Sequence, residues 1–365
     1  MSLAIVLEFE MEYNKPFDQD DPNAPYVDGN PATGTEGSIP SARSIEHDQR
    51  EVVEVINWAY NHGFTDQDNN PCLAPTWMDL TQLRKAIYGI CKSLIPPPVS
   101  NFLINDTDRY VDGTIGSDTL YDGYSATITA GHGPFKTMQR ALMALYAVNL
   151  NGHTFNIHVA NGTYNFDQRL DMLAPNGSGA VAIIGNEVTP SSVTFNSLAG
   201  SCVAASGGLY YLRGLKFIAN GAIIPGDVTA GVWCAGASTV FTINCEYGNC
   251  KGPHVSVGSV YAPHSAQIIT GNAPWHIYVT GNSVFSQPNL PDYNIPGAVA
   301  FSSAFIQVES GGSHVGTYNS LTGAANVTGK RYYVRLNGTI NTGTSNANYF
   351  PGTIAGTTDT GGQYI

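Results

Sequence analysis

The chain has 365 residues, of which 42% are hydrophobic and 12% are charged, and its formal net charge is −12 at pH 7. This length permits a large buried core in about two or three domains, and the low charge with abundant apolar residues excludes a disordered polyelectrolyte. Residues 154–365 hold eight acids and seven bases, so the remaining 20 acids and 9 bases place a net charge of −11 on residues 1–153. No basic run is present to neutralise phosphates, which argues against nucleic-acid binding.

Residues 1–46 predict an extended N-terminal arm. The opening MSLAIVLEF is apolar, but it has neither the basic start nor the length of a secretory signal, and no apolar run approaches the roughly 18 residues of a membrane span. Most of the segment is rich in proline, glycine and acidic residues and lacks periodicity. This composition predicts an arm that gains structure only by lying on a partner, with a plain disordered tail as the alternative.

Residues 47–98 predict a short helical region. Apolar residues on one face predict a helix over about 48–62, with Gly63 as its stop. A second helix is predicted over about 79–94, and its apolar residues are spaced 3, 4, 3 and 4 apart: Leu80, Leu83, Ile87, Ile90 and Leu94. This seam suits a three-stranded coiled coil, but it spans barely two heptads, and an intramolecular helical hairpin explains it about as well. The prolines from Pro96 to Pro98 then predict a stiff joint.

Residues 99–340 predict a body of short strands. A strand, an acidic loop and a helix over about 135–146 come first, followed by a strand over 155–159 and many short strands separated by Gly or Asn turns. Similar strand–turn units start 29 and 28 residues apart, at Val203, Val232 and Val260 and again at Ile277, Ile306 and Val334. Such a period predicts a β-solenoid, although strand frequency alone leaves a sandwich or a barrel open. The helix favours the solenoid, because it can cover the open end of a stacked core.

The body offers few residues for catalysis. A glycosidase needs two carboxylates about 5–10 Å apart, and Asp227 and Glu246, 19 residues apart, are the nearest to such a pair. We expect each to be an isolated turn or surface residue. Lys251 is the type of base that a lyase uses, but no acidic cluster accompanies it. We therefore predict no catalytic residue and no cofactor, and we leave open an active site shared between subunits.

Two groups of metal-ligating residue types fail the spacing that a metal site needs. The acidic loop could supply oxygen ligands for calcium, but it does not match an EF-hand, and Asp-Gly turns explain it better; its carboxylates are Asp106, Asp108, Asp112, Asp118 and Asp122. The segment CEYGNCKGPH spaces Cys245, Cys250 and His254 more widely than zinc sites prefer and offers no fourth ligand. We predict no bound metal.

The six cysteines are predicted to be free, buried thiols of a protein made in a reducing cytosol. Cys202, Cys234 and Cys245 are expected to be stacked inside the solenoid. Five scattered histidines are predicted to be structural or surface residues: His132, His158, His264, His276 and His314. No G-x-S-x-G motif marks a nucleophile.

Aromatic residues in the middle of the body are the more useful functional signal. Tyr261, Trp275, Tyr278 and Tyr293 flank turns, and sugar faces stack on aromatic rings, so these residues predict a weak glycan-binding surface. Core packing is expected to account for at least half of them.

Three stretches resemble the tail fibre and tail spike proteins of bacteriophages, and together they cover a little under half of the chain. The N-terminal arm followed by EHDQREVVEVINWA resembles the opening of such proteins. YVDGTIGSDTLYDG, with GPFKTMQRAL and TFNIHVANGTY, resembles the start of their pectate-lyase-like β-helix, and the end from RYYVRLNG onward resembles their C-terminal segment. The resemblance implies a homotrimeric virion protein, made in the host cytoplasm, with a right-handed parallel β-helix body and an N-terminus anchored to other tail or baseplate proteins.

Residues 341–365 are predicted to form a separate segment that wraps around its copies in the trimer. The last twenty residues carry a single charge, Asp359, and three aromatics, Tyr349, Phe350 and Tyr364, which would be buried between chains. Glycines would supply the backbone angles that such wrapping needs.

Two functions compete at this point. The first is a non-enzymatic trimeric appendage that adsorbs to host glycan, and the second is a depolymerase spike that cleaves this glycan. The scarcity of carboxylates favours the first. A secreted pectate-lyase-like enzyme is disfavoured, because a signal peptide is missing and the arm is of the virion type.

Overall fold

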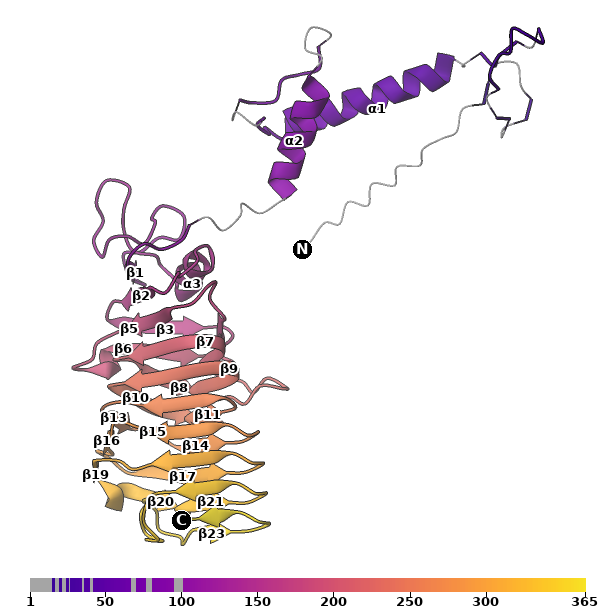
Figure 1. The fold of residues 1–365 in the computed structure, drawn as a ribbon. Coiled ribbons are helices and arrows are strands. Elements are labelled where there is room, and N and C mark those ends of the chain that lie inside the picture. Colours follow the sequence, from indigo (N-terminus) through magenta and orange to yellow (C-terminus); the bar gives the residue numbers. More distant parts are fainter. Residues whose placement is uncertain are drawn as a thin grey trace. The chain divides into compact units, whose positions relative to one another are not determined.

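A computed structural model describes residues 15–16, 20–21, 24–25, 27–34, 36–39, 42–66, 70–76, 81–94 and 101–365, with the backbone alone for 42–49 and 91–94. The chain divides into two compact units, Met1–Pro98 and Val99–Ile365 (Figure 1). Much of the predicted arm and the prolines of the predicted joint lie outside the described residues. None of the described helices is long and apolar enough to cross a membrane.

The first unit contains helices α1 (Ala42–Asn61) and α2 (Gln82–Leu94). Helix α1 begins inside the segment predicted as an arm and ends, as predicted, just before Gly63, which has a φ of 65°. Leu83 and Ile90 of α2 pack against a small buried cluster that includes Ile56 of α1. This packing is the one that the helical-hairpin alternative predicts. Of the other seam residues, Ile87 is 48% exposed, whereas Leu80 and the side chain of Leu94 lie outside the described residues.

The second unit is a solenoid in which the chain winds through three faces in a constant order, and every ladder between its named strands is parallel. Face A consists of β3 (Gly162–Phe166), β6 (Val193–Ser197), β8 (Lys216–Ala219), β10 (Cys245–Cys250), β13 (Gln267–Ile269), β16 (Asp292–Asn294) and β19 (Ser320–Thr322). Face B consists of β4 (Leu170–Leu173), the first parts of β7 (Val203–Arg213) and β9 (Val232–Ile243), β11 (Val255–Val257), β14 (Ala273–Val279), β17 (Val299–Val308), β20 (Val327–Gly329), β21 (Tyr332–Val334) and β23 (Thr357–Thr358).

Face C consists of β1 (Thr107–Val111), β2 (Thr154–Val159), β5 (Ala180–Ile184), the second parts of β7 and β9, β12 (Val260–Pro263), β15 (Val284–Gln287), β18 (Ser313–Gly316), β22 (Thr339–Asn341) and β24 (Gln363–Tyr364). The strands stack along one axis from β1 to β24 (Figure 1). The predicted parallel solenoid is confirmed at this level, and the parallel ladders exclude an antiparallel sandwich.

The register between coils confirms the 29-residue steps of the predicted repeat and corrects the 28-residue steps. Val203 pairs with Val232, and Ile277 pairs with Ile306. Val232, however, pairs with Val255 on face B, whereas Val260 belongs to face C. In the same way Ile306 pairs with Tyr332, two residues before Val334. Coils change length at their corners, so a single sequence period cannot follow the register.

The core is a column of apolar side chains that the three faces enclose, and helix α3 (Met138–Tyr146) packs against its first coils. Met138, Leu142 and Leu145 of α3 are buried in this core, as predicted for a capping helix, although α3 begins three residues later than predicted. Thr137 caps α3 by accepting a hydrogen bond from the backbone N–H of Arg140. Two further short 3-10 turns, Pro190–Ser192 and Ala324–Asn326, lie between strands.

Residues 341–365 continue the solenoid. The predicted boundary falls within β22, and β23 and β24 then pair in parallel with β21 and β22 to form one more coil. Phe350 is 3% exposed and contacts rings of Phe305 and His314, while the rings of Tyr364 and Tyr332 are stacked. The chain itself therefore buries Phe350, which was predicted to be buried between chains.

Candidate functional site

The two carboxylates nearest to a catalytic pair each have their own cationic partner. Oδ2 of Asp227 lies 3.0 Å from Nη1 of Arg169, and Oδ1 accepts hydrogen bonds from the backbone and the hydroxyl of Ser201. Glu246 pairs with Nζ of Lys216 at 2.7 Å and accepts a hydrogen bond from the hydroxyl of Thr270. Lys216 and Glu246 lie on successive coils, whereas Arg169 and Asp227 lie two coil steps apart, so both ion pairs tie coils of the solenoid together.

The side chains of Cys245, Cys250 and His254 are not gathered into one group of metal-ligating residues. Cys245 donates to the carbonyl of Leu212, and Nδ1 of His254 lies 3.1 Å from Nδ1 of His276. Among the described residues no group of three or more His, Cys, Asp or Glu side chains could hold a metal ion. Five cysteines are free and buried, as predicted, and the side chain of Cys91 lies outside the described residues. The expected stacking fails, because Cys234 pairs with Ala205 and not with Cys202.

The carboxylates of the acidic loop accept hydrogen bonds from the loop itself and from its neighbours. Asp112 and Asp122 accept backbone N–H groups two residues ahead, which is the turn geometry expected of Asp-Gly pairs. Asp118 accepts the backbone N–H groups at the start of α3. Asp108 accepts a hydrogen bond from Nε2 of His158, and Asp106 accepts one from the backbone of Thr154.

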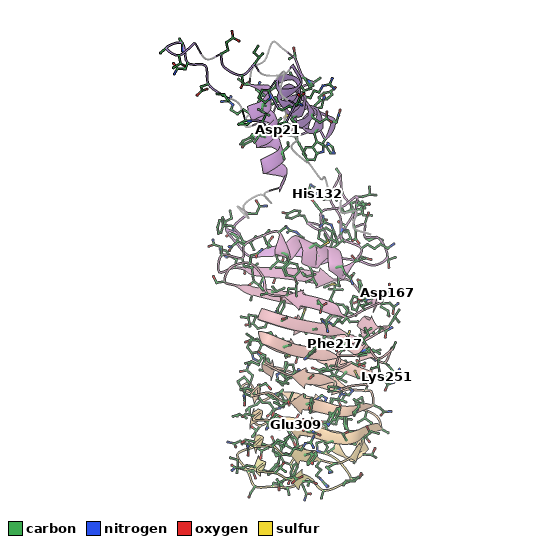
Figure 2. All side chains as sticks on the ribbon, turned by 90° about the vertical axis from the view of Figure 1, so that its right-hand side faces the viewer. Asp21, His132, Asp167, Phe217, Lys251 and Glu309 are labelled. Atoms are coloured by element: carbon green, nitrogen blue, oxygen red, sulfur yellow. The ribbon has the colours of Figure 1, made fainter. Side chains whose placement is uncertain are left out.

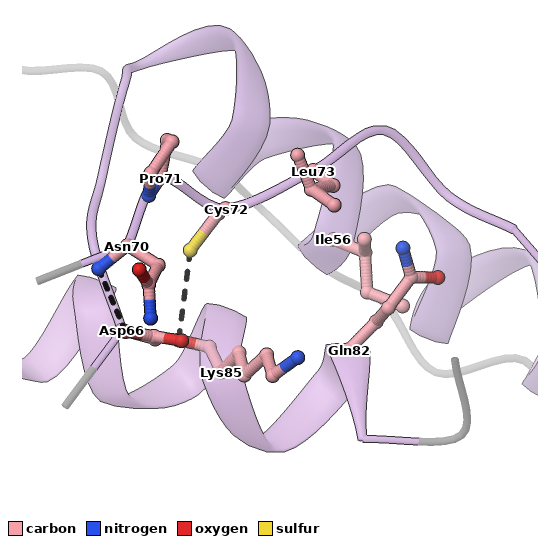
Figure 3. A pocket seen from close by; sticks show the side chains of 8 residues that line it. All are labelled: Ile56, Asp66, Asn70, Pro71, Cys72, Leu73, Gln82 and Lys85. Atoms are coloured by element: carbon pink, nitrogen blue, oxygen red, sulfur yellow. Dashed lines mark hydrogen bonds between the residues drawn. The ribbon is translucent and has the colours of Figure 1, made fainter. Parts of the chain in front are cut away.

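A pocket of about 210 Å³ lies in the helical unit, between α1, α2 and the segment that joins them (Figure 3). Its thiol, Cys72, donates to the carbonyl of Lys85 at 3.7 Å. Burial and the nearby charge of Asp66 raise the pKa of Cys72 more than Lys85 lowers it. The thiol of Cys72 therefore stays protonated at neutral pH and is not activated as a nucleophile.

The four aromatic residues singled out from the sequence divide evenly between core and surface. Tyr261 and Tyr293 are 1% and 4% exposed and belong to the core. Trp275 and Tyr278, both on β14, are half-buried on the outside of face B, with their ring centroids 5.1 Å apart. The expectation that packing accounts for at least half of these residues is confirmed.

Trp275 and Tyr278 belong to a connected group, the face B cluster, which also contains Gln307, Glu309, Tyr333 and Arg335. The indole Nε1 of Trp275 donates to Oε1 of Gln307 at 2.8 Å, and the amide of Gln307 donates to Glu309 at 2.7 Å. Glu309 also accepts the hydroxyl of Tyr278 and Nε of Arg335, each at 2.6 Å. The ring of Tyr333 lies 5.1 Å from the guanidinium of Arg335. Three successive coils are thus linked through one carboxylate.

Glu309 is an ionised carboxylate that holds the cluster together. Burial by itself would raise its pKa, but hydrogen bonds from Tyr278, Arg335 and Gln307 outweigh burial and keep the pKa below its ordinary value. Burial and the bond to Glu309 raise the pKa of Tyr278 to about 12, so its hydroxyl stays protonated as a donor. The indole and phenol rings are therefore fixed in place, which reduces the entropy lost when a ligand stacks on them.

An open depression of about 510 Å³ lies beside the face B cluster, at the corner where the chain passes from face A to face B. Asn249, Asn272, Ser302 and Lys251 are among its lining residues, together with Pro274, the neighbour of Trp275. Figure 2 labels Lys251 and Glu309, and Lys251 lies nearer the N-terminal end of the solenoid. Aromatic rings, amides and a lysine therefore occur on adjoining surfaces.

Sequence reasoning found Trp275 and Tyr278 but missed Gln307, Glu309, Tyr333 and Arg335. The signal was present in the strands FIQVES and RYYVRLNG, where polar residues alternate with apolar or aromatic ones. Only the register, which pairs Tyr278 with Gln307 and Gln307 with Tyr333, shows that these residues are neighbours. No family model matches the chain, and no curated protein or solved structure was found to be similar to it.

Proposed function

We propose that this chain is a structural appendage of a bacteriophage virion, of the tail fibre or tail spike type, and that its solenoid adsorbs to glycan on the host surface. The observation that carries the adsorption is the face B cluster, in which Trp275 and Tyr278 are half-buried and held by Gln307 and Glu309. Fixed aromatic rings beside hydrogen-bonding amides suit the apolar faces and hydroxyl groups of sugars. The virion assignment rests on the three stretches that resemble tail proteins.

The state of the carboxylates supports adsorption without cleavage. Glycoside hydrolysis needs one carboxylic acid that still holds a proton and a second carboxylate nearby. Hydrogen bonds lower the pKa of Glu309 and of Asp227 despite burial, which would raise both. Glu246 forms an ion pair with Lys216 and accepts a hydrogen bond from the hydroxyl of Thr270. Neither Glu309 nor Asp227 is therefore suited to donate a proton at neutral pH.

One observation favours the depolymerase alternative. Glu309 and Asp359 directly follow Val308 and Thr358, which are two coil steps apart in one register column. Two steps between parallel strands amount to about 9–10 Å, near the separation of the carboxylates in inverting glycosidases. Arg335 lies on the intermediate coil and bonds to Glu309, which weighs against this function.

Two further features complete the proposal. We infer a right-handed winding, because parallel strand–crossover–strand connections are right-handed in nearly all proteins. We also infer a homotrimer anchored to other virion proteins through the N-terminal arm, as the resemblance to tail proteins implies.

Binding of polysaccharides to the full-length protein tests the function. We expect binding without release of reducing ends, and we expect Trp275→Ala to weaken it about tenfold, or by about 1.4 kcal/mol. Tyr211→Ala is the matched control, because Tyr211 is a half-buried aromatic residue on face C. Binding that is indifferent to Trp275 would contradict the site. Release of reducing ends that Asp359→Asn abolishes would establish the depolymerase.

A further inference from the structure

The basic residues of the solenoid divide into paired and unpaired groups. Residues 154–365, all of which the structure describes, contain seven Lys and Arg side chains. Four of them form ion pairs with carboxylates: Arg169, Arg213, Lys216 and Arg335. Within this described part of the chain, Lys251, Lys330 and Arg331 have no carboxylate within ion-pair distance. A chain with net charge −12 thus leaves three cations of residues 154–365 without an ion pair.

These three cations lie at the two ends of one strip of surface. Lys251 is exposed in the depression at the corner of faces A and B. Lys330 and Arg331 immediately precede β21, and Nζ of Lys330 lies 4.8 Å from the ring centroid of Tyr333 in the face B cluster. Lys251 and Ala273 line the same depression from neighbouring coils. In the register, Ala273 pairs with Phe301 on the next coil, and Phe301 pairs with Gly329, the residue before Lys330. Three coil steps therefore separate the ends of the strip, about 14 Å along the axis.

The surface between the two ends is suited to a sugar chain. The side-chain oxygens of Asn249 and Asn272 accept backbone N–H groups of the next coil, at 2.8 Å each. Their side-chain NH2 groups have no partner within the described chain and are exposed, so they can donate to a ligand. Trp275 follows directly along β14, and its ring is fixed by Gln307. Amide donors and an aromatic ring thus lie between the cations.

The charge along the strip is positive. It contains four cations, Lys251, Lys330, Arg331 and Arg335, and two carboxylates, Glu309 and Asp359. Glu309 is neutralised by Arg335 at 2.6 Å, and Asp359 accepts a hydrogen bond from the hydroxyl of Tyr333 at 3.5 Å. A neutral glycan would leave the unpaired cations without partners, whereas an anionic glycan would supply the missing charges.

We propose that this strip binds an anionic glycan, with carboxylate or phosphate groups at Lys251 and at the Lys330–Arg331 pair and with its chain along the solenoid axis. The proposal rests on the proposed glycan-binding function and names its ligand class. Carboxylate and phosphate groups share the chemistry that lysine and arginine recognise. The aromatic and amide groups between the cations distinguish a glycan from an arbitrary polyanion.

The test compares polygalacturonate with its methyl ester, using full-length protein in binding assays at low and moderate salt. We expect tighter binding of the charged polymer, with an affinity that falls as salt rises. The double variant K251Q/K330Q should bind polygalacturonate at least tenfold more weakly and leave binding of the methyl ester unchanged. K136Q, at an exposed lysine that follows the acidic loop, is the matched control. Binding of a teichoic acid, measured in the same way, tests phosphate groups in place of carboxylates. Circular dichroism verifies that each variant is folded.

The outcomes separate this inference from the proposed function. Equal binding of both polymers, unaffected by K251Q/K330Q, overturns the anionic ligand and leaves glycan adsorption standing. If a single-stranded oligonucleotide binds as tightly as polygalacturonate, the assignment of a glycan ligand is overturned and the strip is only a general surface for polyanions. Absence of binding to polygalacturonate, its ester and teichoic acid overturns both the inference and the proposed function. Charge-selective binding of either anionic polymer that depends on Lys251 and Lys330 supports the proposal and identifies the anion.

Discussion

Nδ1 of His254 lies 3.1 Å from Nδ1 of His276 inside the solenoid, where both rings are buried beside Tyr247. A hydrogen bond between two imidazole nitrogens needs one N–H donor and one bare nitrogen, so at least one ring must be neutral. Burial lowers the pKa of His254 to about 3 and that of His276 well below its ordinary value. The fold therefore keeps both rings uncharged at neutral pH.

The stability of the solenoid should fall in mild acid. The unfolded chain protonates its histidines below about pH 6.5, whereas the folded chain protonates His254 and His314 only near pH 3. The free energy of unfolding is thus at its full value above pH 6.5 and falls toward pH 3, by about 1.4 kcal/mol per pH unit for each such histidine. Urea unfolding of the full-length protein between pH 7.5 and 4.5 measures this slope.

Substitutions of single histidines test whether the buried imidazole rings cause this pH dependence of the free energy of unfolding. His276→Phe should flatten it, and His314→Asn is an alternative if the first variant does not fold. Ile354→Ala, at an exposed side chain without a titratable group, should leave the slope unchanged. A stability that stays constant from pH 7 to 5 would contradict the account.

Removing the charge of Asp227 or Glu246 should weaken the fold without affecting glycan binding. Asp227→Asn leaves Arg169 with Asp171 as its remaining partner, and Glu246→Gln leaves Lys216 unpaired. Since Arg169 and Lys216 are partly exposed, we expect losses of about 1–3 kcal/mol for each variant. Thermal unfolding and polysaccharide binding should be measured on the same samples. Lost depolymerising activity in either variant would instead assign it to catalysis.

Phe350→Ala should destabilise the last coil of a single chain. The ring is 3% exposed and packs against Phe305, His314 and Tyr364, so its truncation should cost about 3–5 kcal/mol. Ile354→Ala, at a side chain that is 56% exposed, is the control and should change stability by less than about 0.5 kcal/mol. Equal thermal midpoints for the two variants would show that Phe350 contributes little.

Deletion of residues 345–365 tests the inferred trimer. The deletion removes β23 and β24 together with Phe350 and leaves β21 and β22 without their last partners. We expect lower stability and loss of the trimeric mass, measured by light scattering beside the full-length protein. A stable trimer after deletion would place the subunit contacts elsewhere, and a full-length monomer would remove the trimer from the proposal.

Limited proteolysis tests the N-terminal arm. Its composition predicts that the segment before residue 46 is cut first, while residues 101–365 resist because of their stacked core. Mass spectrometry of the fragments locates the first cuts. An arm that survives while the solenoid is cut would count against attachment through an extended segment.

The sequence predicted the class of fold because β-strand periodicity and a nearly constant repeat are local signals. The pairs Val203–Val232 and Ile277–Ile306 emerged correctly, because those coils keep one length. Val260 was assigned to the wrong column, because the preceding coil is shorter and composition gives no sign of it. Register depends on the corners, and corner lengths are set by tertiary packing that spacing alone does not reveal.

The candidate site was only partly predictable, for a related reason. Trp275 and Tyr278 stood out because they are large aromatics near turns, yet Tyr261 and Tyr293 had the same appearance and are buried. Whether a residue is buried depends on the face of the solenoid on which its strand lies and on whether its side chain points inward or outward along that strand. Both depend on the register between coils. Glu309 was not singled out, because its partners Tyr278 and Arg335 are 31 and 26 residues away in the sequence.

The uneven coils have a consequence for how such a protein changes over time. Paired residues are 33 apart between Leu170 and Val203 but only 21 apart between Val240 and Tyr261, and both pairs remain in register. Insertions and deletions are thus taken up by the corners while the interior stays aligned. A lineage can change the outer surface by editing corner segments, such as the one that bears Lys251, and inherit the stacked scaffold unchanged.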